Sequence, residues 1–343
     1  MTKPGNRLYE KGHYRAGIIG CGFFAQFQIE AWRRMPDVEL VCACDLDIAK
    51  ARQAASRAYT SAEEMLANEE VDFVDIATRP DSHLELVKMA AERGIAAICQ
   101  KPAATTWQDA VAIVEAAERA GVPFMFHENW RWQPWFREVS RRISAGDIGE
   151  PIAYGFRTRK RDGFGADAYP AQPYFRQMPR LLIYETLVHQ IDTAMFLFGG
   201  IRTIYAHARR VNPLIRGEDR VVLVLAHDTS VDGYVDGHRF ADLVPESPLI
   251  GDASFEGAEG TLHVAATGDV LLNGVCVWRN EITTGYRGDS VLATQQHFIE
   301  CLRTNRPMES GGRAYLKTVA CVEAAYLSLQ RGARVAPGET FPC

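Results

Sequence analysis

Three side chains capable of acid–base chemistry lie at helical spacing within residues 184–192. Glu185, His189 and Asp192 are four and three residues apart, which places them on one face of a helix. A carboxylate beside an imidazole orients the ring and stabilises its charged form, as a general base requires. Such a face could instead be solvent-exposed, or bind a divalent metal. Because no second ligand cluster is evident, we expect no metal.

A lysine that could serve the same reaction follows an apolar run over residues 95–99. Lys101 stands directly before Pro102 in the sequence CQKP. Ligands of open α/β sheets bind at the carboxyl ends of strands, so a lysine held there could reach both a cofactor and a substrate. The alternative is a surface lysine in a turn.

The elements that would position these groups begin with residues 15–45, where a strand, a glycine-rich turn, a helix and a second strand follow one another. Gly20 permits the tight turn, Gly22 lets the backbone approach a pyrophosphate at the helix N-terminus, and Ala25 allows close helix–strand packing. Asp45 can accept hydrogen bonds from ribose hydroxyls and would repel a 2′-phosphate. We therefore expect NAD rather than NADP, with a solvated Asp45 as the alternative.

Strand and helix alternate up to about residue 126, as a doubly wound parallel sheet requires. Beyond it the pattern predicts helices over 132–145 and 181–198, strands that include 151–161 and 253–264, and closing helices over 290–304 and 312–331. A turn-rich aromatic stretch covers 162–179. The fold class is therefore α/β. We expect an N-terminal Rossmann domain over 1–126 and an α/β domain with a large, mostly antiparallel open sheet over 127–343.

Composition excludes several other classes. The chain of 343 residues has a formal net charge of -5 and a pI near 6.0, whereas nucleic-acid binders are usually basic. Its longest aliphatic run, Val221 to Ala226, is too short to span a bilayer. The eight cysteines lack metal-ligand spacing, which favours a reducing, cytoplasmic location.

Together these motifs resemble the glucose-fructose oxidoreductase, inositol dehydrogenase and MocA (Gfo/Idh/MocA) family of NAD(P)-dependent sugar and polyol dehydrogenases. Besides the glycine turn, the family's Thr-Pro-Pro-x-x-His appears as residues 78–83, its Glu-Lys-Pro as 100–102, and its Asp-x-x-x-His-x-x-Asp as 185–192. There are two departures. Gln100 replaces the usual Glu and removes a negative charge beside Lys101, and Glu185 replaces the usual Asp and adds one methylene.

The resemblance implies that Lys101 and His189 are the catalytic pair and that Glu185 holds the imidazole. It also implies a homodimer or homotetramer formed through the open sheet of the second domain. The expected cofactor contacts are Gly20, Gly22, Phe23, Phe24, Ala25, Asp45, Thr78, Pro80, His83, Gln100 and Lys101. The expected sugar-substrate contacts are Lys101, Trp130, Arg131, Tyr174, Arg176, Glu185, His189 and Asp192.

Within the family, residues 99–102, 127–135 and 179–186 are similar to those of D-apiose dehydrogenases, which oxidise a branched aldopentose at its anomeric carbon to a lactone. The alternatives are an inositol or cyclic-sugar dehydrogenase and, in another class, a non-catalytic NAD-binding scaffold or sensor. His83 is as well suited to a structural role as to a cofactor contact. The basic residues of 157–161 could bind an anionic substrate, but a solvated or carboxylate-paired strand face is the commoner use of such a pattern.

Overall fold

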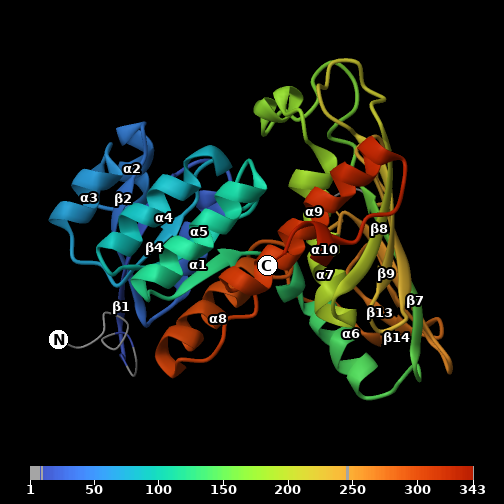
Figure 1. Cartoon of the computed structure of the whole chain (residues 1–343). Coiled ribbons are helices and arrows are strands. Elements are labelled where there is room, and N and C mark those ends of the chain that lie inside the picture. Colours follow the sequence, from blue (N-terminus) through green and yellow to red (C-terminus); the bar gives the residue numbers. More distant parts are fainter. Residues whose placement is uncertain (1–7, 9–10, 245–246, 343) are drawn as a thin grey trace. The chain divides into compact units, whose positions relative to one another are not determined.

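The computed structural model describes residues 8, 11–244 and 247–342. The chain divides into two compact units, described here separately. One comprises Met1–Asn129 with Val291–Leu316, and the other comprises Trp130–Ser290 with Lys317–Cys343. Figure 1 shows both units and their elements.

The first unit is built on a six-stranded parallel sheet in the order β3-β2-β1-β4-β5-β6. Its strands are β1 (Tyr14–Ile19), β2 (Val38–Cys44), β3 (Arg57–Tyr59), β4 (Phe73–Ile76), β5 (Ala96–Gln100) and β6 (Phe124–His127). Its connecting helices are α1 (Ala25–Arg34), α2 (Ile48–Ala54), α3 (Ala62–Asn68), a 3₁₀ turn (Pro80–Ser82), α4 (His83–Glu92) and α5 (Trp107–Ala120). This order confirms the predicted doubly wound sheet.

Local chemistry accounts for where these helices begin and end. The Ser61 side chain accepts a hydrogen bond from the amide of Glu64 at the start of α3, and Thr106 does the same for Asp109 at the start of α5. Gly121, at φ 66°, closes α5 in the left-handed conformation that glycine adopts without strain. The short edge strand β3 was not predicted.

Helix α8 (Ser290–Thr304) also packs in the first unit. Its Phe298, Ile299 and Leu302 lie in one buried cluster with β1 and β4 side chains that include Tyr14 and Phe73. The sequence-based division placed this helix with residues 127–343, whereas the structure groups Val291–Leu316 with the first unit. A chain segment that returns to an earlier domain leaves no signal in local periodicity.

The second unit is built on an eight-stranded sheet in the order β14-β13-β12-β11-β7-β10-β9-β8. Its strands are β7 (Pro151–Arg159), β8 (Ile201–Arg209), β9 (Arg220–His227), β10 (Asp232–His238), β11 (Gly251–Gly257), β12 (Thr261–Val264), β13 (Val270–Leu272) and β14 (Val275–Trp278). Strand β10 runs parallel to β7, and the other described pairs are antiparallel. The predicted large, mostly antiparallel sheet is confirmed.

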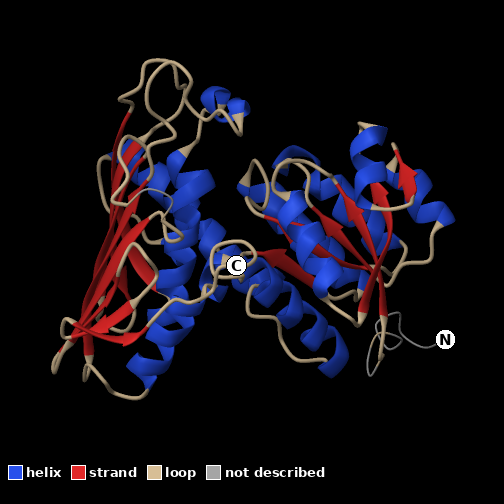
Figure 2. Cartoon of the chain, turned by 180° about the vertical axis from the view of Figure 1, so that it is seen from behind, coloured by secondary structure: helices blue, strands red, loops and turns tan. Residues whose placement is uncertain are grey.

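Helices cover one face of this sheet and leave the other face open (Figure 2). They are α6 (Pro134–Ser144), α7 (Val188–Phe198), most of α9 (Gly312–Arg331) and α10 (Pro337–Thr340). The unit also has 3₁₀ turns at Trp130–Trp132 and Pro173–Gln177. Two expectations for this unit were wrong in detail. The strand expected over 253–264 is the hairpin β11–β12, and the helix expected over 181–198 begins with a π-helical segment at Leu182–Leu187.

Candidate functional site

The glycine-rich turn lies between β1 and α1 and leaves space for a ligand. Gly20 has φ +93°, and a Cβ there would lie 2.8 Å from the carbonyl of Ala77, so the fold itself requires glycine. A Cβ at Gly22 would meet no atom within 4 Å among the described residues. Protein packing therefore does not demand glycine at position 22, whereas a pyrophosphate lying against the backbone would.

Asp45 follows β2 and binds the same turn. Its Oδ2 accepts a hydrogen bond from the Cys21 amide at 2.7 Å, and its Oδ1 accepts one from the Asp47 amide at 2.9 Å. Each carboxylate oxygen carries a second lone pair, so both can still accept a ribose hydroxyl. Asp45 thus holds the turn in place and remains available to a nucleotide.

His83 connects two loops at the carboxyl edge of the parallel sheet. It is fully buried, with Nδ1 3.0 Å from the Ala103 carbonyl oxygen and Nε2 3.1 Å from that of Thr78. Burial lowers its pKa, despite these carbonyls. These contacts support the structural role for His83: it ties the loop after β4, with Thr78 and Pro80, to the loop that follows Lys101.

Gln100 and Lys101 stand where β5 ends. The Gln100 side chain is buried, and its Oε1 accepts a hydrogen bond from the Lys101 amide at 2.7 Å. Its Nε2 has no hydrogen-bond partner within the described residues. Burying a hydrogen-bond donor without an acceptor costs free energy. We therefore expect the Gln100 Nε2 group to donate to a bound ligand. Lys101 itself is half-buried.

His127 is a polar residue at this edge that sequence reasoning missed. It pairs with Gln100 across β5 and β6, and its ring lies 6.4 Å from that of Phe24 in the glycine turn. Burial lowers its pKa to about 4, outweighing the influence of its own backbone and of Glu128. A polar residue at the carboxyl end of a predicted parallel strand was the signal that could have identified it.

In the second unit, His189 lies at the start of α7. It is buried, and its ring stacks on Trp130 with 4.5 Å between centroids and 16° between planes. Its neighbour Asp192 is also buried. The alternative of a solvent-exposed helix face is therefore wrong for His189 and Asp192, whereas Glu185 is half-buried. Trp130, which was expected to contact sugar, packs one face of its ring against the imidazole.

Asp192 and Arg131 form a buried ion pair. Arg131 donates from Nε and Nη2 to the two carboxylate oxygens, both at 2.7 Å, and Thr318 donates to Oδ1 at 2.9 Å. Such a two-point contact is strong and directional. It anchors the 3₁₀ turn at residues 130–132 to α7 and uses side chains that were expected to contact substrate.

Glu185 lies in the π-helical segment and has a partner that the sequence did not reveal. Thr186 Oγ1 donates to Glu185 Oε2 at 2.9 Å, and Arg239 donates to the same hydroxyl at 2.9 Å. Arg239 in turn binds Asp162. These four side chains link the end of β10 to the loop after β7.

The other basic residues that could bind a substrate lie close to aspartates. Arg157 is paired with Asp252, and Arg159 lies 2.5 Å from Asp236. This arrangement supports the alternative of a carboxylate-paired strand face over an anion site. Arg176, expected to contact substrate, lies 3.7 Å from Asp167. Nearby Tyr174 is 43% exposed, which leaves its ring accessible to a ligand.

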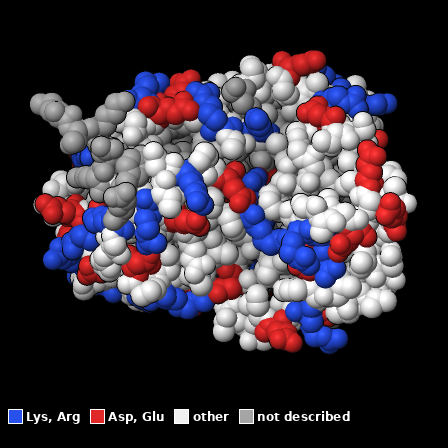
Figure 3. Space-filling view, turned by 90° about the horizontal axis from the view of Figure 1, so that it is seen from below, with Lys and Arg blue, Asp and Glu red and all other residues white. Residues whose placement is uncertain are grey.

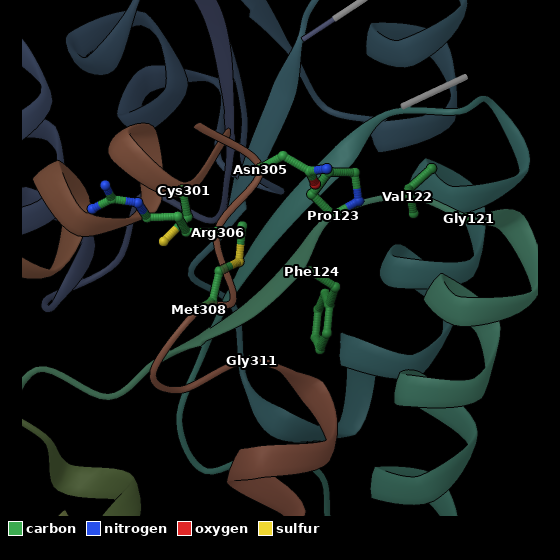
Figure 4. Close-up of a pocket in the computed structure, with 9 residues that line it drawn as sticks. All are labelled: Gly121, Val122, Pro123, Phe124, Cys301, Asn305, Arg306, Met308 and Gly311. Atoms are coloured by element: carbon green, nitrogen blue, oxygen red, sulfur yellow. The ribbon is translucent and has the colours of Figure 1, made fainter. Parts of the chain in front are cut away.

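A pocket of about 310 Å³ lies elsewhere in the first unit (Figure 4). Its walls include Phe124 at the start of β6 and Cys301, Arg306 and Met308 around the end of α8. The amino ends of parallel strands lie at the sheet edge opposite the glycine turn. This pocket is therefore separate from the expected cofactor contacts. Burial raises the pKa of Cys301 to about 11, which disfavours the nucleophilic thiolate.

Other site classes find little support. Among the described residues, no group of three or more His, Cys, Asp or Glu could hold a metal ion. Within the same residues, no helix combines the length and the apolar character needed to cross a membrane. On the face shown in Figure 3, positive and negative side chains are interspersed, so this view shows no broad basic surface of the kind that binds nucleic acid.

Comparison with known proteins decides the family. Residues 14–128 match the model described as an oxidoreductase family with an NAD-binding Rossmann fold, and residues 136–261 match the GFO/IDH/MocA C-terminal domain. The chain belongs to the GFO/IDH/MocA oxidoreductase family. Membership confirms the expected NAD-binding domain, the α/β partner domain and an enzyme of the oxidoreductase class.

Two relatives and one solved structure show how far the similarity extends. The chain is 38% identical to a D-apiose dehydrogenase of Paraburkholderia graminis, over 94% of this chain and 89% of the relative. It is 34% identical to a D-apiose dehydrogenase of Rhizobium rhizogenes, over 94% and 96%. A crystal structure of an Agrobacterium radiobacter oxidoreductase in complex with NAD+, L-tartaric acid and magnesium has a TM-score of 0.87 and 33% identity, covering 96% of this chain and 99% of that one.

Proposed function

We propose that this protein is an NAD-dependent sugar dehydrogenase that oxidises an aldopentose of the D-apiose type at C1 to a lactone. The observation that carries the proposal is the 38% identity to a D-apiose dehydrogenase over nearly the whole chain. The buried, stacked His189 supports it, because a general base must be held in a fixed orientation.

The described residues fit the cofactor. The open space at Gly22 suits a pyrophosphate, Asp45 can accept from the ribose hydroxyls, and the buried Nε2 of Gln100 has no acceptor among the described residues. When bound, NAD supplies the nicotinamide carbon that takes the hydride. The residues proposed to hold it are Gly20, Gly22, Phe23, Phe24, Ala25, Asp45, Thr78, Pro80, Gln100 and Lys101.

In the proposed mechanism, the substrate hydroxyl hydrogen-bonds to Lys101 and His189. His189 Nε2 or Nδ1 removes the hydroxyl proton as the adjacent C–H bond breaks. The Lys101 ammonium stabilises the developing alkoxide, a contribution of about 3–4 kcal/mol for one well-placed donor. Glu185 stabilises the imidazolium that forms. Trp130 keeps the ring in place by stacking, while Asp192 retains Arg131 and thereby fixes the start of the domain.

The test is an initial-rate panel of aldoses and inositols with NAD and with NADP, in which the product is examined for lactone. We expect turnover of D-apiose with NAD, and His189→Ala should lower kcat by a factor of about 10² or more while leaving NADH affinity close to wild type. Oxidation of inositols alone would replace the proposed substrate. NADH binding without turnover of any sugar would favour a scaffold or sensor.

We also propose that the open face of the second sheet joins copies of this chain as a homodimer or homotetramer. A row of paired residues crosses this face: Tyr234, Val224 and Tyr205 are aligned on β10, β9 and β8, and each is at least 38% exposed. Exposed apolar patches of this kind commonly mark interfaces. Val224→Asp should release monomers in light scattering. Because the described cysteines form no disulfide, we propose the cytoplasm as the location.

A further inference from the structure

A buried ionic network in the second unit ends on Glu185. Arg239 directly follows β10 and is 7% exposed. Its Nε donates to Asp162 Oδ1 at 2.6 Å, its Nη2 contacts the other carboxylate oxygen, and its Nη1 donates to Thr186 Oγ1 at 2.9 Å. The Thr186 hydroxyl is within 2.9 Å of Glu185 Oε2. Arg239 therefore bridges the loop after β7 and the π-helical segment.

The direction of these hydrogen bonds is fixed by chemistry. A guanidinium carries only donors, so the Thr186 oxygen must accept from Arg239. The single proton of the hydroxyl is then directed to Glu185 Oε2, which must act as an acceptor. The Glu185 carboxylate is thus held at Oε2 by a donor whose direction is fixed.

The charges around this network favour the same state. Burial opposes the charge on Arg239, but Asp162 outweighs it, and the pKa of Arg239 is raised by Asp162, Tyr169 and Glu185. Burial likewise opposes ionisation of Asp162, and the Arg239 charge overcomes that effect and lowers its pKa. Lys160 also lies 3.5 Å from Asp162. Arg239 therefore stays charged and donates to the Thr186 hydroxyl from a fixed position.

We infer that Thr186 and Arg239 are positioning residues for the dehydrogenase reaction: through Oε2 they fix the Glu185 carboxylate, which the proposed function assigns to the support of His189. The inference rests on the proposed function, because only that function gives Glu185 its role beside His189. Neither residue touches the reacting atoms in this scheme. Arg239 acts through Thr186, and Thr186 acts through Glu185.

The decisive variant is Thr186→Val, which keeps the branched shape and removes the hydroxyl. Losing a donor to a carboxylate favours its protonated form, so the acidic limb of the kcat/KM profile should move to higher pH by about one unit. At pH values on that limb, kcat/KM should therefore be about tenfold lower than in the wild type. The KM for NAD should not change, because the proposed cofactor contacts lie in the first unit. Thr186→Ser retains the hydroxyl and should restore most of the wild-type profile.

Thr158→Val is a matched control in the same unit. Thr158 is buried on β7, and its hydroxyl has no hydrogen-bond partner among the described residues. The same chemical change there should leave the pH profile unaltered. If Thr186→Val folds poorly, Arg239→Lys provides a second variant that keeps the charge but loses the two-point contact with Asp162; it should shift the acidic limb in the same direction.

A readout independent of turnover is the carboxyl resonance that disappears in Glu185→Gln, titrated by ¹³C NMR in the wild type and in Thr186→Val. We expect that resonance to titrate at a higher pH in Thr186→Val. Identical titration and an unmoved pH profile in folded Thr186→Val would overturn the inference. Failure of the proposed function looks different, because the wild type would then not oxidise aldoses with NAD, whereas the carboxyl titrations of the wild type and Thr186→Val can be compared without turnover.

Discussion

Asp75 allows the effect of burial on a charge in the first unit to be measured. It lies within β4, is fully buried, and accepts hydrogen bonds from Trp32 Nε1 at 2.8 Å and from Gln28 Nε2 at 3.0 Å. Burial raises the pKa of its carboxyl from 3.8 to about 7, although the bond from Trp32 opposes the rise. The folded protein therefore retains a proton on Asp75 at pH values where the unfolded chain releases it.

Retaining that proton makes stability fall as the pH rises. The contribution is fully present below about pH 4, is lost progressively up to about pH 7, and is absent above it. The shift from 3.8 to about 7 corresponds to about 4 kcal/mol, at about 1.4 kcal/mol for each pH unit. Asp75→Asn supplies a neutral side chain of the same shape that can accept from Trp32. After a rotation of the Gln28 amide that exchanges its Nε2 and Oε1, it can also donate to Gln28 Oε1, which has no partner within the described residues.

Urea unfolding of wild type and Asp75→Asn, followed by circular dichroism from about pH 4 to about pH 8, measures the difference. We expect Asp75→Asn to be more stable by up to about 4 kcal/mol at the alkaline end and similar to wild type at the acidic end. Asp72→Asn is the control, because Asp72 is paired with Lys11 at 2.6 Å and should lose stability near neutral pH. Parallel curves for wild type and Asp75→Asn would refute the reasoning.

Three further predictions concern the cofactor turn and the buried ion pair. Gly22→Ala should keep the unfolding midpoint and weaken NADH binding about tenfold in a fluorescence titration, whereas Gly20→Ala should lower the midpoint, because its Cβ would lie 2.8 Å from a backbone carbonyl. Arg131→Met leaves the Asp192 carboxylate buried without its arginine and should cost about 3–5 kcal/mol in urea unfolding. Asp45→Ser removes the negative charge that would repel a 2′-phosphate. Its kcat/KM ratio for NAD over NADP should fall, and an unchanged ratio would remove Asp45 from cofactor selection.

Local sequence patterns were sufficient to predict the turns and helix ends that depend only on residues close together in the sequence. The turn at Gly20 and the end of α5 at Gly121 both depend on backbone conformations that glycine tolerates, so residue type alone indicates them. The hydrogen bond that the Ser61 side chain accepts from the Glu64 amide is equally local. By contrast, Arg239 and Asp162 are 77 residues apart, and no spacing rule brings them together.

The π-helical segment changes which spacing rule applies around Glu185. Apolar periodicity predicted a continuous helix over 181–198, because hydrophobic residues alone do not distinguish an α-helical turn from a wider one. The 3.6-residue period holds only from Val188 onward. His189 and Asp192 therefore follow the predicted helical face, while Glu185 takes its position from the wider turn and from Thr186.

The two carboxylates near His189 have different partners, and this difference separates their possible roles. Asp192 receives Arg131 on both oxygens and Thr318 on one, so its charge is already matched by a guanidinium. Glu185 accepts a hydrogen bond from the neutral hydroxyl of Thr186 at Oε2, and the guanidinium of Arg239 donates to that hydroxyl. A carboxylate that is oriented through a hydroxyl can stabilise an imidazole that becomes positive during catalysis. We therefore expect Asp192 to anchor Arg131, and Glu185 to stabilise the imidazolium of His189.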